Sequence, residues 1–111
     1  MAIKQYNPTT PGRRGMSSQD FSGVTTKKPL RSLVKSVKRG SGRNNQGRIT
    51  TRHQGGGARK HYRLVNFDFK GEGVVEHIEY DPNRSARIAR IKDDKGTYHY
   101  ILAASGMQQG Q

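Results

Sequence analysis

The fold is decided by residues 74–103, which read VVEHIEYDPNRSARIARIKDDKGTYHYILA. Three runs, 74–80, 87–92 and 97–103, contain mostly β-branched, aromatic and other strand-compatible residues. DPNRS separates the first two runs and DDKG the last two, and both segments are strong turn signals. In the second turn, Gly96 stands where a tight hairpin needs positive φ. The stretch therefore predicts consecutive antiparallel strands.

A fourth run, 62–69, precedes these three and alternates Val65, Phe67 and Phe69 before a KGEG turn at 70–73. In the run 74–80, Glu76 interrupts the alternation. Four short strands with tight connections predict a mainly β fold, a small antiparallel OB-like barrel, either complete or without its last strand. The expected core consists of Leu64, Val65, Phe67, Val74, Ile78, Ile88, Ile91, Tyr98, Tyr100 and Leu102.

Charge divides the chain into two parts. Up to Arg63 there are 15 Lys and Arg residues against one acid, Asp20, whereas from Leu64 onward there are 6 against 7. We therefore expect an extended basic arm at 1–60 and an OB-like β domain at 61–111. Such an arm suits nucleic acid, an anionic membrane or an acidic protein. Release of condensed counterions from phosphates favours nucleic acid.

Composition excludes several classes of protein. The 111 residues are enough for one small domain, and without cysteine neither a disulfide nor a thiolate metal site can form. No apolar run approaches the roughly 20 residues of a membrane span. Helices that lie on a membrane surface are usually longer and more apolar than any stretch of this chain, so no membrane partner is expected. The Arg-rich, Ser/Thr-rich and acid-poor start also has the composition of a cleaved organelle presequence, which composition alone leaves open.

Within the arm, residues 1–28 show no apolar period and are expected to be irregular and extended. Residues 29–38 differ, because Leu30, Leu33, Val34 and Val37 have the i, i+3, i+4, i+7 spacing of an amphipathic helix that begins at Pro29. This helix is too short to be stable alone and is expected to pack on a neighbouring element.

Residues 39–60 hold six glycines, five arginines and one lysine among amide side chains. Glycines allow the main chain close to an RNA backbone, and arginines bind phosphate oxygens in a forked geometry. A flexible linker with solvated charge is the alternative. The stretch 42–49 is a near miss to a nucleotide-binding phosphate loop, but Arg48 replaces the lysine and Ile49 lacks the hydroxyl.

The remaining chemistry-bearing residues do not indicate catalysis. His53, His61, His77 and His99 lack zinc-ligand spacing, and no Ser/His/Asp grouping is present. The acids of the second half fall mostly at strand ends and turns, where solvated charge is normal. We therefore expect no enzyme activity, no metal and no cofactor.

Several stretches together resemble one family: PGRR at 11–14, GRNNQGRITTRH at 42–53, GGG at 55–57, YR at 62–63 and EYDPNRS at 79–85. The chain is similar over residues 6–110 to the bacterial-type large-subunit ribosomal protein two, the L-two family. The resemblance implies an OB-type β-barrel that binds large-subunit ribosomal RNA near the peptidyl-transferase region and the subunit interface. Because it begins inside the arm, it weakens the presequence interpretation.

Members of that family are much longer, with a second barrel and a C-terminal extension, so functions tied to those parts are not carried over. The expected fifth strand of the barrel would begin near residues 106–111. The barrel is therefore expected either to stay open or to be completed by a second chain or a missing C-terminal domain. On this resemblance we expect the chain to be a fragment, one half of a split protein or a truncated version.

The sequence thus predicts a structural component of the large ribosomal subunit, with ribosomal RNA and other ribosomal proteins as partners. It would lie in cytoplasmic ribosomes or, alternatively, in organellar ones. The alternative function is a free-standing OB-fold protein that binds single-stranded nucleic acid on its sheet face. Arg84 has a turn-stabilising role as an equal alternative to RNA binding. The predicted RNA-binding residues are Arg13, Arg14, Arg43, Asn44, Asn45, Arg48, Arg52, His53, Arg59, Lys60, His61, Tyr62, Arg63 and Arg84.

Overall fold

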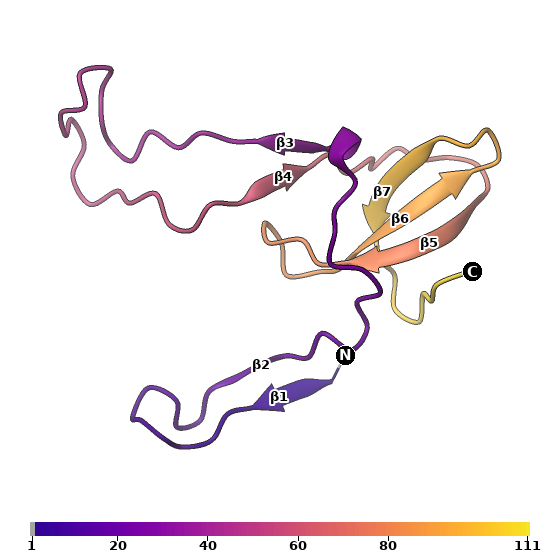
Figure 1. Cartoon of the computed structure of the whole chain (residues 1–111), viewed down its shortest axis with the longest axis horizontal. Coiled ribbons are helices and arrows are strands. Elements are labelled where there is room, and N and C mark those ends of the chain that lie inside the picture. Colours follow the sequence, from indigo (N-terminus) through magenta and orange to yellow (C-terminus); the bar gives the residue numbers. More distant parts are fainter. Residues whose placement is uncertain (1) are drawn as a thin grey trace.

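The computed structural model describes residues 2–111 and is mainly β, as predicted. Its elements are β1 (Ile3–Gln5), β2 (Ser17–Gln19), the 3-10 turn η1 (Arg31–Leu33), β3 (Val34–Ser36), β4 (His61–Arg63), β5 (Gly73–Glu79), β6 (Ile88–Asp93) and β7 (Tyr98–Leu102). The pairs β1–β2 and β3–β4 each form a two-stranded antiparallel ribbon. The three-stranded sheet is ordered β5–β6–β7. Figure 1 shows both ribbons projecting from the same side of this sheet.

The β5–β6–β7 meander and its turns confirm the prediction for residues 74–103. In the β6–β7 turn, the Asp93 carboxylate accepts bonds from the Lys95 and Thr97 amides at 3.0 and 2.8 Å, and Gly96 has φ +83°. Between β5 and β6, Asp81 accepts a bond from the Asn83 amide at 2.9 Å. A side-chain acceptor therefore fixes each turn, and a left-handed glycine also fixes the β6–β7 turn, as the sequence indicated.

A β-bulge between Val75 and His77 explains why Glu76 interrupts the alternation in β5. The extra residue places Val75 and Ile78, three positions apart, on one face. There they pack with Ala89 and Ile91 as the core cluster. The expectation that Val74 is buried is consequently wrong, since it lies on the opposite face and is 56% exposed.

The rest of the expected core is partly confirmed. Ile78, Ile88, Ile91 and Tyr100 are buried, whereas Leu64, Val65 and Tyr98 are only half-buried. Phe67 and Leu102 are exposed, contrary to expectation.

The run 62–69 is not one strand, which accounts for the exposure of Phe67. Its start, β4, pairs with β3, and Val65 forms a single parallel bridge to Tyr100. The Asn66 side chain then accepts a bond from the Asp68 amide at 3.0 Å. This local turn ends the extended stretch and directs Phe67 outward.

The prediction of an amphipathic helix at 29–38 is wrong. Only η1 is helical, and the chain continues directly into β3. A short helix must overcome a costly nucleus. Val34 instead extends and pairs with Arg63 in β4, and the Leu64 amide bonds the Leu33 carbonyl at 2.9 Å. Hydrogen bonding to another strand therefore replaces the local helix.

Residues 1–28, expected to be irregular, contain the hairpin β1–β2. The hydroxyls of Tyr6 and Ser18 lie 3.1 Å apart across it. These two are the half-buried side chains in residues 2–20, where every other side chain is exposed. The hairpin thus lacks the apolar pattern by which a strand is recognised in sequence.

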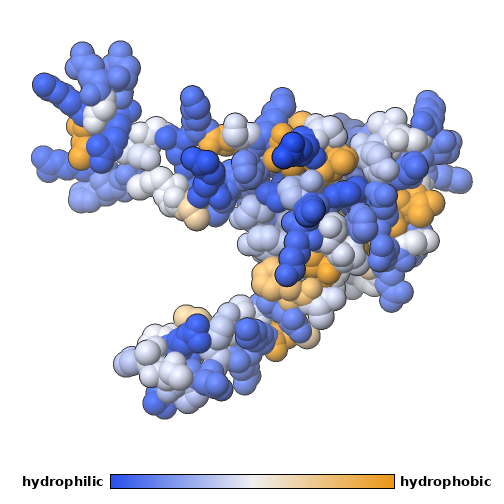
Figure 2. All heavy atoms as spheres, viewed as in Figure 1, coloured by the Kyte–Doolittle hydropathy of each residue, from blue (hydrophilic) through white to orange (hydrophobic). Residues whose placement is uncertain are grey.

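The chain is extended for its size. Its radius of gyration is 18.1 Å and its extents are 50 × 43 × 21 Å, whereas a compact chain of this length would have a radius of gyration of roughly 13 Å. Figure 2 shows two mainly hydrophilic projections separated by an open hollow. Within residues 2–111, the structure contains no helix with the length and apolar character needed to cross a membrane.

Candidate nucleic-acid interface

The longer projection, here called the long hairpin, comprises residues 34–63 and ends in a tip loop, residues 42–51. Arg43 and Ile49 form a bridge across this loop. Inside it, the Asn44 Oδ1 atom accepts bonds from the Gln46 and Arg48 amides, both at 3.0 Å. The tip loop therefore has its own hydrogen-bonded structure without any apolar core.

Gly42 closes the tip loop. Its carbonyl oxygen accepts bonds from the Thr50 and Thr51 amides at 2.8 and 3.0 Å. Gly42 has φ +70°, and a Cβ atom there would overlap the Thr51 carbonyl oxygen. Both its left-handed conformation and this close approach require glycine.

The predicted contact residues of the tip loop and the segment after it are mostly free to bind a ligand. Arg43, Asn45, Arg48, Arg52 and His53 are all exposed. Two of the predicted side chains also bond inside the loop: Arg43 Nη1 donates to the Gly47 carbonyl at 3.4 Å, and the side-chain oxygen of Asn44 accepts the two bonds given above. Its structural role was not apparent from composition, although Asn is a common residue for such local bonds.

The base of the long hairpin is joined to the sheet. The Asn83 Nδ2 atom donates to the His61 carbonyl at 2.9 Å, and Arg63 Nη1 donates to the same carbonyl at 2.7 Å. Arg59, Lys60, His61 and Tyr62 are exposed, and Arg63 is half-buried. Farther along, Arg39 Nη1 crosses the ribbon to the Gly56 carbonyl at 3.2 Å.

The shorter projection, the N-terminal hairpin of residues 3–19, presents Arg13 and Arg14. Both amides bond the Thr10 carbonyl, at 3.1 and 3.0 Å, which forms the turn. The Arg13 guanidinium lies 4.8 Å from the Tyr6 ring centroid, and the Lys4 ammonium lies 5.3 Å from it. Cations therefore gather around one aromatic ring on this hairpin.

The two halves of the chain differ in whether their basic side chains form ion pairs. Within residues 2–111 there are three ion pairs, Asp81–Arg84, Glu79–Arg90 and Asp93–His99. None involves any of the 15 Lys and Arg residues up to Arg63. All of these except half-buried Arg63 are exposed. The described part of the chain thus leaves this positive charge available to an external anion.

Arg84 differs from the other predicted residues. Its Nε atom lies 2.7 Å from the Asp81 carboxylate, and its guanidinium lies 5.9 Å from the Phe67 ring. Asp81 is fully buried. This geometry supports the turn-stabilising role that the sequence left open.

A buried polar cluster fixes the segment between the two projections to the sheet. Arg90 bonds both Glu79 carboxylate oxygens, at 3.0 and 3.1 Å, and donates to the Lys28 carbonyl at 3.0 Å. Burial opposes the charged form of Arg90, but Glu79 outweighs it and the pKa of Arg90 is raised. The Tyr100 hydroxyl accepts a bond from the Leu30 amide at 2.8 Å, and burial raises the pKa of Tyr100.

Several residues of the same surface were missed from the sequence. Other basic side chains without an ion pair accompany the predicted ones on the projections and the segment between them: Lys4, Lys27, Lys28, Arg31, Lys35, Lys38 and Arg39. The charge asymmetry already contained that signal. In the described residues, no group of three or more His, Asp or Glu side chains forms a metal-binding cluster.

A small antiparallel sheet carrying two hairpins of unpaired cations is the architecture of a protein that binds a polyanion. Residues 30–111 match the family model described as "Ribosomal Proteins L2, RNA binding N-terminal domain". The chain belongs to this family of ribosomal proteins, and the match covers most of its length. It therefore has the structural, ribosomal RNA-binding role of a component of the ribosome. The N-terminal hairpin lies outside the matched residues.

Proposed function

We propose that this chain helps to organise large-subunit ribosomal RNA near the peptidyl-transferase region and the subunit interface, and that its two hairpins make the main contacts. The observation that supports this proposal is the set of 15 basic residues up to Arg63, none of which has a carboxylate partner within residues 2–111. The location within the subunit rests on the family resemblance.

In this proposal the arginines neutralise phosphates. Exposed guanidinium groups at Arg13, Arg14, Arg43, Arg48, Arg52 and Arg59, with exposed Lys60 and half-buried Arg63, contact the RNA backbone. Asn45 and His53 contact ribose or base edges, and His61 and Tyr62 stack on bases. Asn44 takes part chiefly by holding the tip loop in shape.

The β sheet acts as the support. Binding lies in residues 1–60 and support in residues 61–111, with β4 common to both because it pairs with β3. Residues 43–60 are exposed throughout and have little apolar area to order them. Their conformation therefore gains most of its stability from the RNA.

The alternative, a sheet face that stacks single-stranded bases, requires exposed aromatic rings there. Tyr100 is fully buried, and its hydroxyl is bonded to Leu30. Tyr98 is half-buried, with the Lys92 ammonium 5.8 Å from its ring. The hairpins are therefore the better-supported surface.

Two further proposals concern the surroundings of the chain. Other ribosomal proteins, and a second chain or C-terminal domain that completes the barrel, are its proposed protein partners. Its proposed location is the ribosome of the cytoplasm, with an organellar ribosome as the alternative. Sedimentation of the chain with large subunits of known origin would test both.

The salt dependence of RNA binding tests the role of the hairpins. Affinity for a transcript of large-subunit ribosomal RNA is measured over a range of salt concentrations for wild type, Arg43→Ala and Arg84→Ala. Because each phosphate contact releases counterions, Arg43→Ala should reduce the slope of log affinity against log salt by about one unit. Arg84→Ala is the matched control and should leave the slope unchanged, since Asp81 already pairs with this residue.

Circular dichroism accompanies the measurement, and the sheet should stay folded in the Arg43→Ala protein. An unchanged slope in Arg43→Ala and similar variants of the other hairpin arginines would contradict the proposal.

A further inference from the structure

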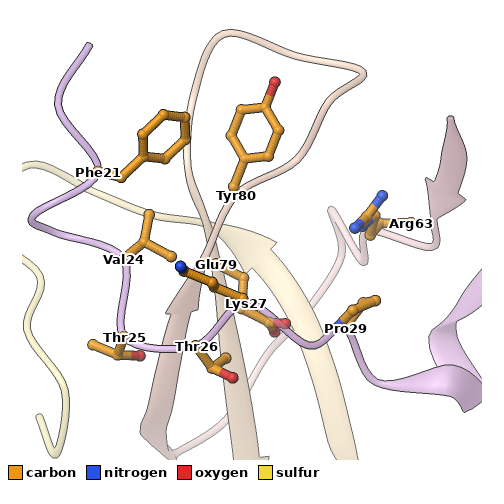
Figure 3. A pocket seen from close by; sticks show the side chains of 9 residues that line it. All are labelled: Phe21, Val24, Thr25, Thr26, Lys27, Pro29, Arg63, Glu79 and Tyr80. Carbon is orange, nitrogen blue, oxygen red and sulfur yellow. The ribbon is translucent and has the colours of Figure 1, made fainter. Parts of the chain in front are cut away.

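A groove of about 470 Å³ lies between the segment 21–29 and the end of β5. Figure 3 shows the rings of Phe21 and Tyr80 side by side at one end of it, with Val24 near Phe21 and Arg63 toward the other end. Its volume falls within the roughly 300–1,000 Å³ typical of small-ligand sites. Phe21 lies outside the residues that match the family.

Two aromatic rings at this groove face solvent. Phe21 is 58% exposed and Tyr80 is 45% exposed, although their centroids lie 5.4 Å apart in an edge-to-face arrangement. Exposed aromatic side chains held in fixed positions are a common feature of binding surfaces. The remaining open faces of these rings are therefore available for stacking.

A buried cation holds both rings in place. Arg87 is 8% exposed, and its guanidinium lies 4.9 Å from the Phe21 ring and 5.3 Å from the Tyr80 ring. Its Nη2 atom also donates to the Asp20 carbonyl at 3.3 Å. The aromatic pair is thus positioned before any ligand arrives.

The backbone of the segment is fixed as well. The Thr25 amide donates to the Ile78 carbonyl at 2.9 Å, and the Thr25 hydroxyl accepts a bond from the Ile78 amide at 3.0 Å. This side of the groove is therefore joined to β5 by paired hydrogen bonds.

The charges lining the groove favour an anionic ligand. Lys27 and Arg63 lie along it and form no ion pair within the described residues. The acid of the groove, Glu79, is 3% exposed and is neutralised by Arg90. Aromatic faces beside unpaired cations suit a nucleotide, whose base stacks while its phosphate is neutralised. An apolar peptide would leave both cations without a partner.

We propose that this groove binds one unpaired nucleotide of the ribosomal RNA, with the base against Phe21 and Tyr80 and the phosphate between Lys27 and Arg63. The proposal rests on the RNA-binding function above and adds a base-stacking site to its phosphate contacts. It places a third contact region on the segment that joins the two hairpins.

Substitution of the rings tests the site. Phe21→Ala and Tyr80→Ala should each weaken binding to the large-subunit RNA transcript by roughly tenfold at fixed salt, in line with the loss of one stacked base. The salt slope should stay that of wild type, because no charge is removed. Phe21→Tyr and Tyr80→Phe keep the rings and should bind within about twofold of wild type, since stacking needs only the ring face.

Photo-crosslinking of the wild-type chain tests the site in a way that does not depend on the folding of the alanine variants. Wild-type chain is irradiated with the same transcript carrying 4-thiouridine, and crosslinked peptides are mapped by mass spectrometry. Crosslinks at Phe21 or Tyr80 support the site. Crosslinks confined to the two hairpins overturn it.

The remaining outcomes separate the two proposals. Alanine variants with wild-type RNA affinity overturn the groove site while the phosphate contacts stand. If the alanine variants bind RNA with wild-type affinity but fail to enter large subunits, the groove binds a protein, and the nucleotide proposal is wrong. If the wild-type chain does not bind the transcript, the proposed function itself fails.

Discussion

The closure of the tip loop depends on a single residue, Gly42. Its φ of +70° belongs to the left-handed region, and its missing Cβ leaves room for the Thr51 carbonyl oxygen. A side chain here would push the two ends of the loop apart. The positions of Arg43 and Arg48, which lie between them, therefore depend on this glycine.

We expect Gly42→Ala to weaken RNA binding without lowering the melting temperature of the sheet. The matched control is Gly47→Ala, which has φ +78° but open space around the new methyl group. Both variants carry the left-handed strain of roughly 1–2 kcal/mol, and the overlap with Thr51 is added in Gly42→Ala alone. RNA affinity and the amide chemical shifts of Thr50 and Thr51 provide the comparison. Equal effects of the two substitutions would show that loop closure does not matter.

At the scale of secondary-structure elements, the contact between the sheet and η1 depends on Tyr100. Its hydroxyl is the acceptor for the Leu30 amide, one residue before η1, at 2.8 Å. The neighbouring Glu79–Arg90 pair bonds the Lys28 carbonyl in the same segment. The base of the longer projection is therefore oriented by polar side chains of the sheet.

Tyr100→Phe should lower the free energy of unfolding by roughly 1–3 kcal/mol, because the Leu30 amide loses its acceptor. The pKa of Tyr100 is raised above its ordinary value of 10.0 in the folded chain. The unfolded chain consequently releases this proton first, so wild-type stability falls as pH rises above about 10. Tyr100→Phe should lose that part of the alkaline decline. Urea unfolding of both proteins at pH 7 and pH 10.5 checks this, and identical pH dependence would refute the role of the hydroxyl.

Predictability from sequence also differs between elements. Strands β5, β6 and β7 were predicted because local turn chemistry at Asp81 and Asp93 defines their ends. The bulge between Val75 and His77 is visible in the sequence only as the irregular Glu76, so the prediction places Ile78 in the core correctly but selects Val74 in place of its neighbour Val75. The expected helix at 29–38 failed because its partner strand, β4, lies far along the sequence. Long-range pairing of this kind leaves no local signal.

The candidate site shows the same limit. Arg and Lys residues of the projections could be identified from charge alone, because charge does not depend on register. The groove of Phe21 and Tyr80 could not, since the two residues are 59 positions apart in the sequence and Arg87 contacts both rings only in the folded chain. Asn44 was assigned to RNA contact for its residue type, whereas its oxygen is occupied within the loop.

At the scale of the whole molecule, the chain is more extended than a compact protein of the same length. Two hydrophilic projections extend from one side of a small sheet (Figures 1 and 2). Glu79, Asp81 and Asp93 form ion pairs with cations of the same half of the chain, whereas within residues 2–111 no basic residue of the projections forms one. The shape and the charge distribution therefore support the proposal that the projections contact RNA and that the sheet holds them in place.

Amide hydrogen exchange of the whole chain, free and bound to the large-subunit RNA transcript, tests this division most directly. We expect residues 3–19 and 34–63 to exchange rapidly in the free chain and to become strongly protected with RNA, because the RNA supplies most of their ordering contacts. Amides of β5, β6 and β7 should be protected in both states and should change little. Protection gained on the sheet alone, with both hairpins still exchanging rapidly in the complex, would contradict the account.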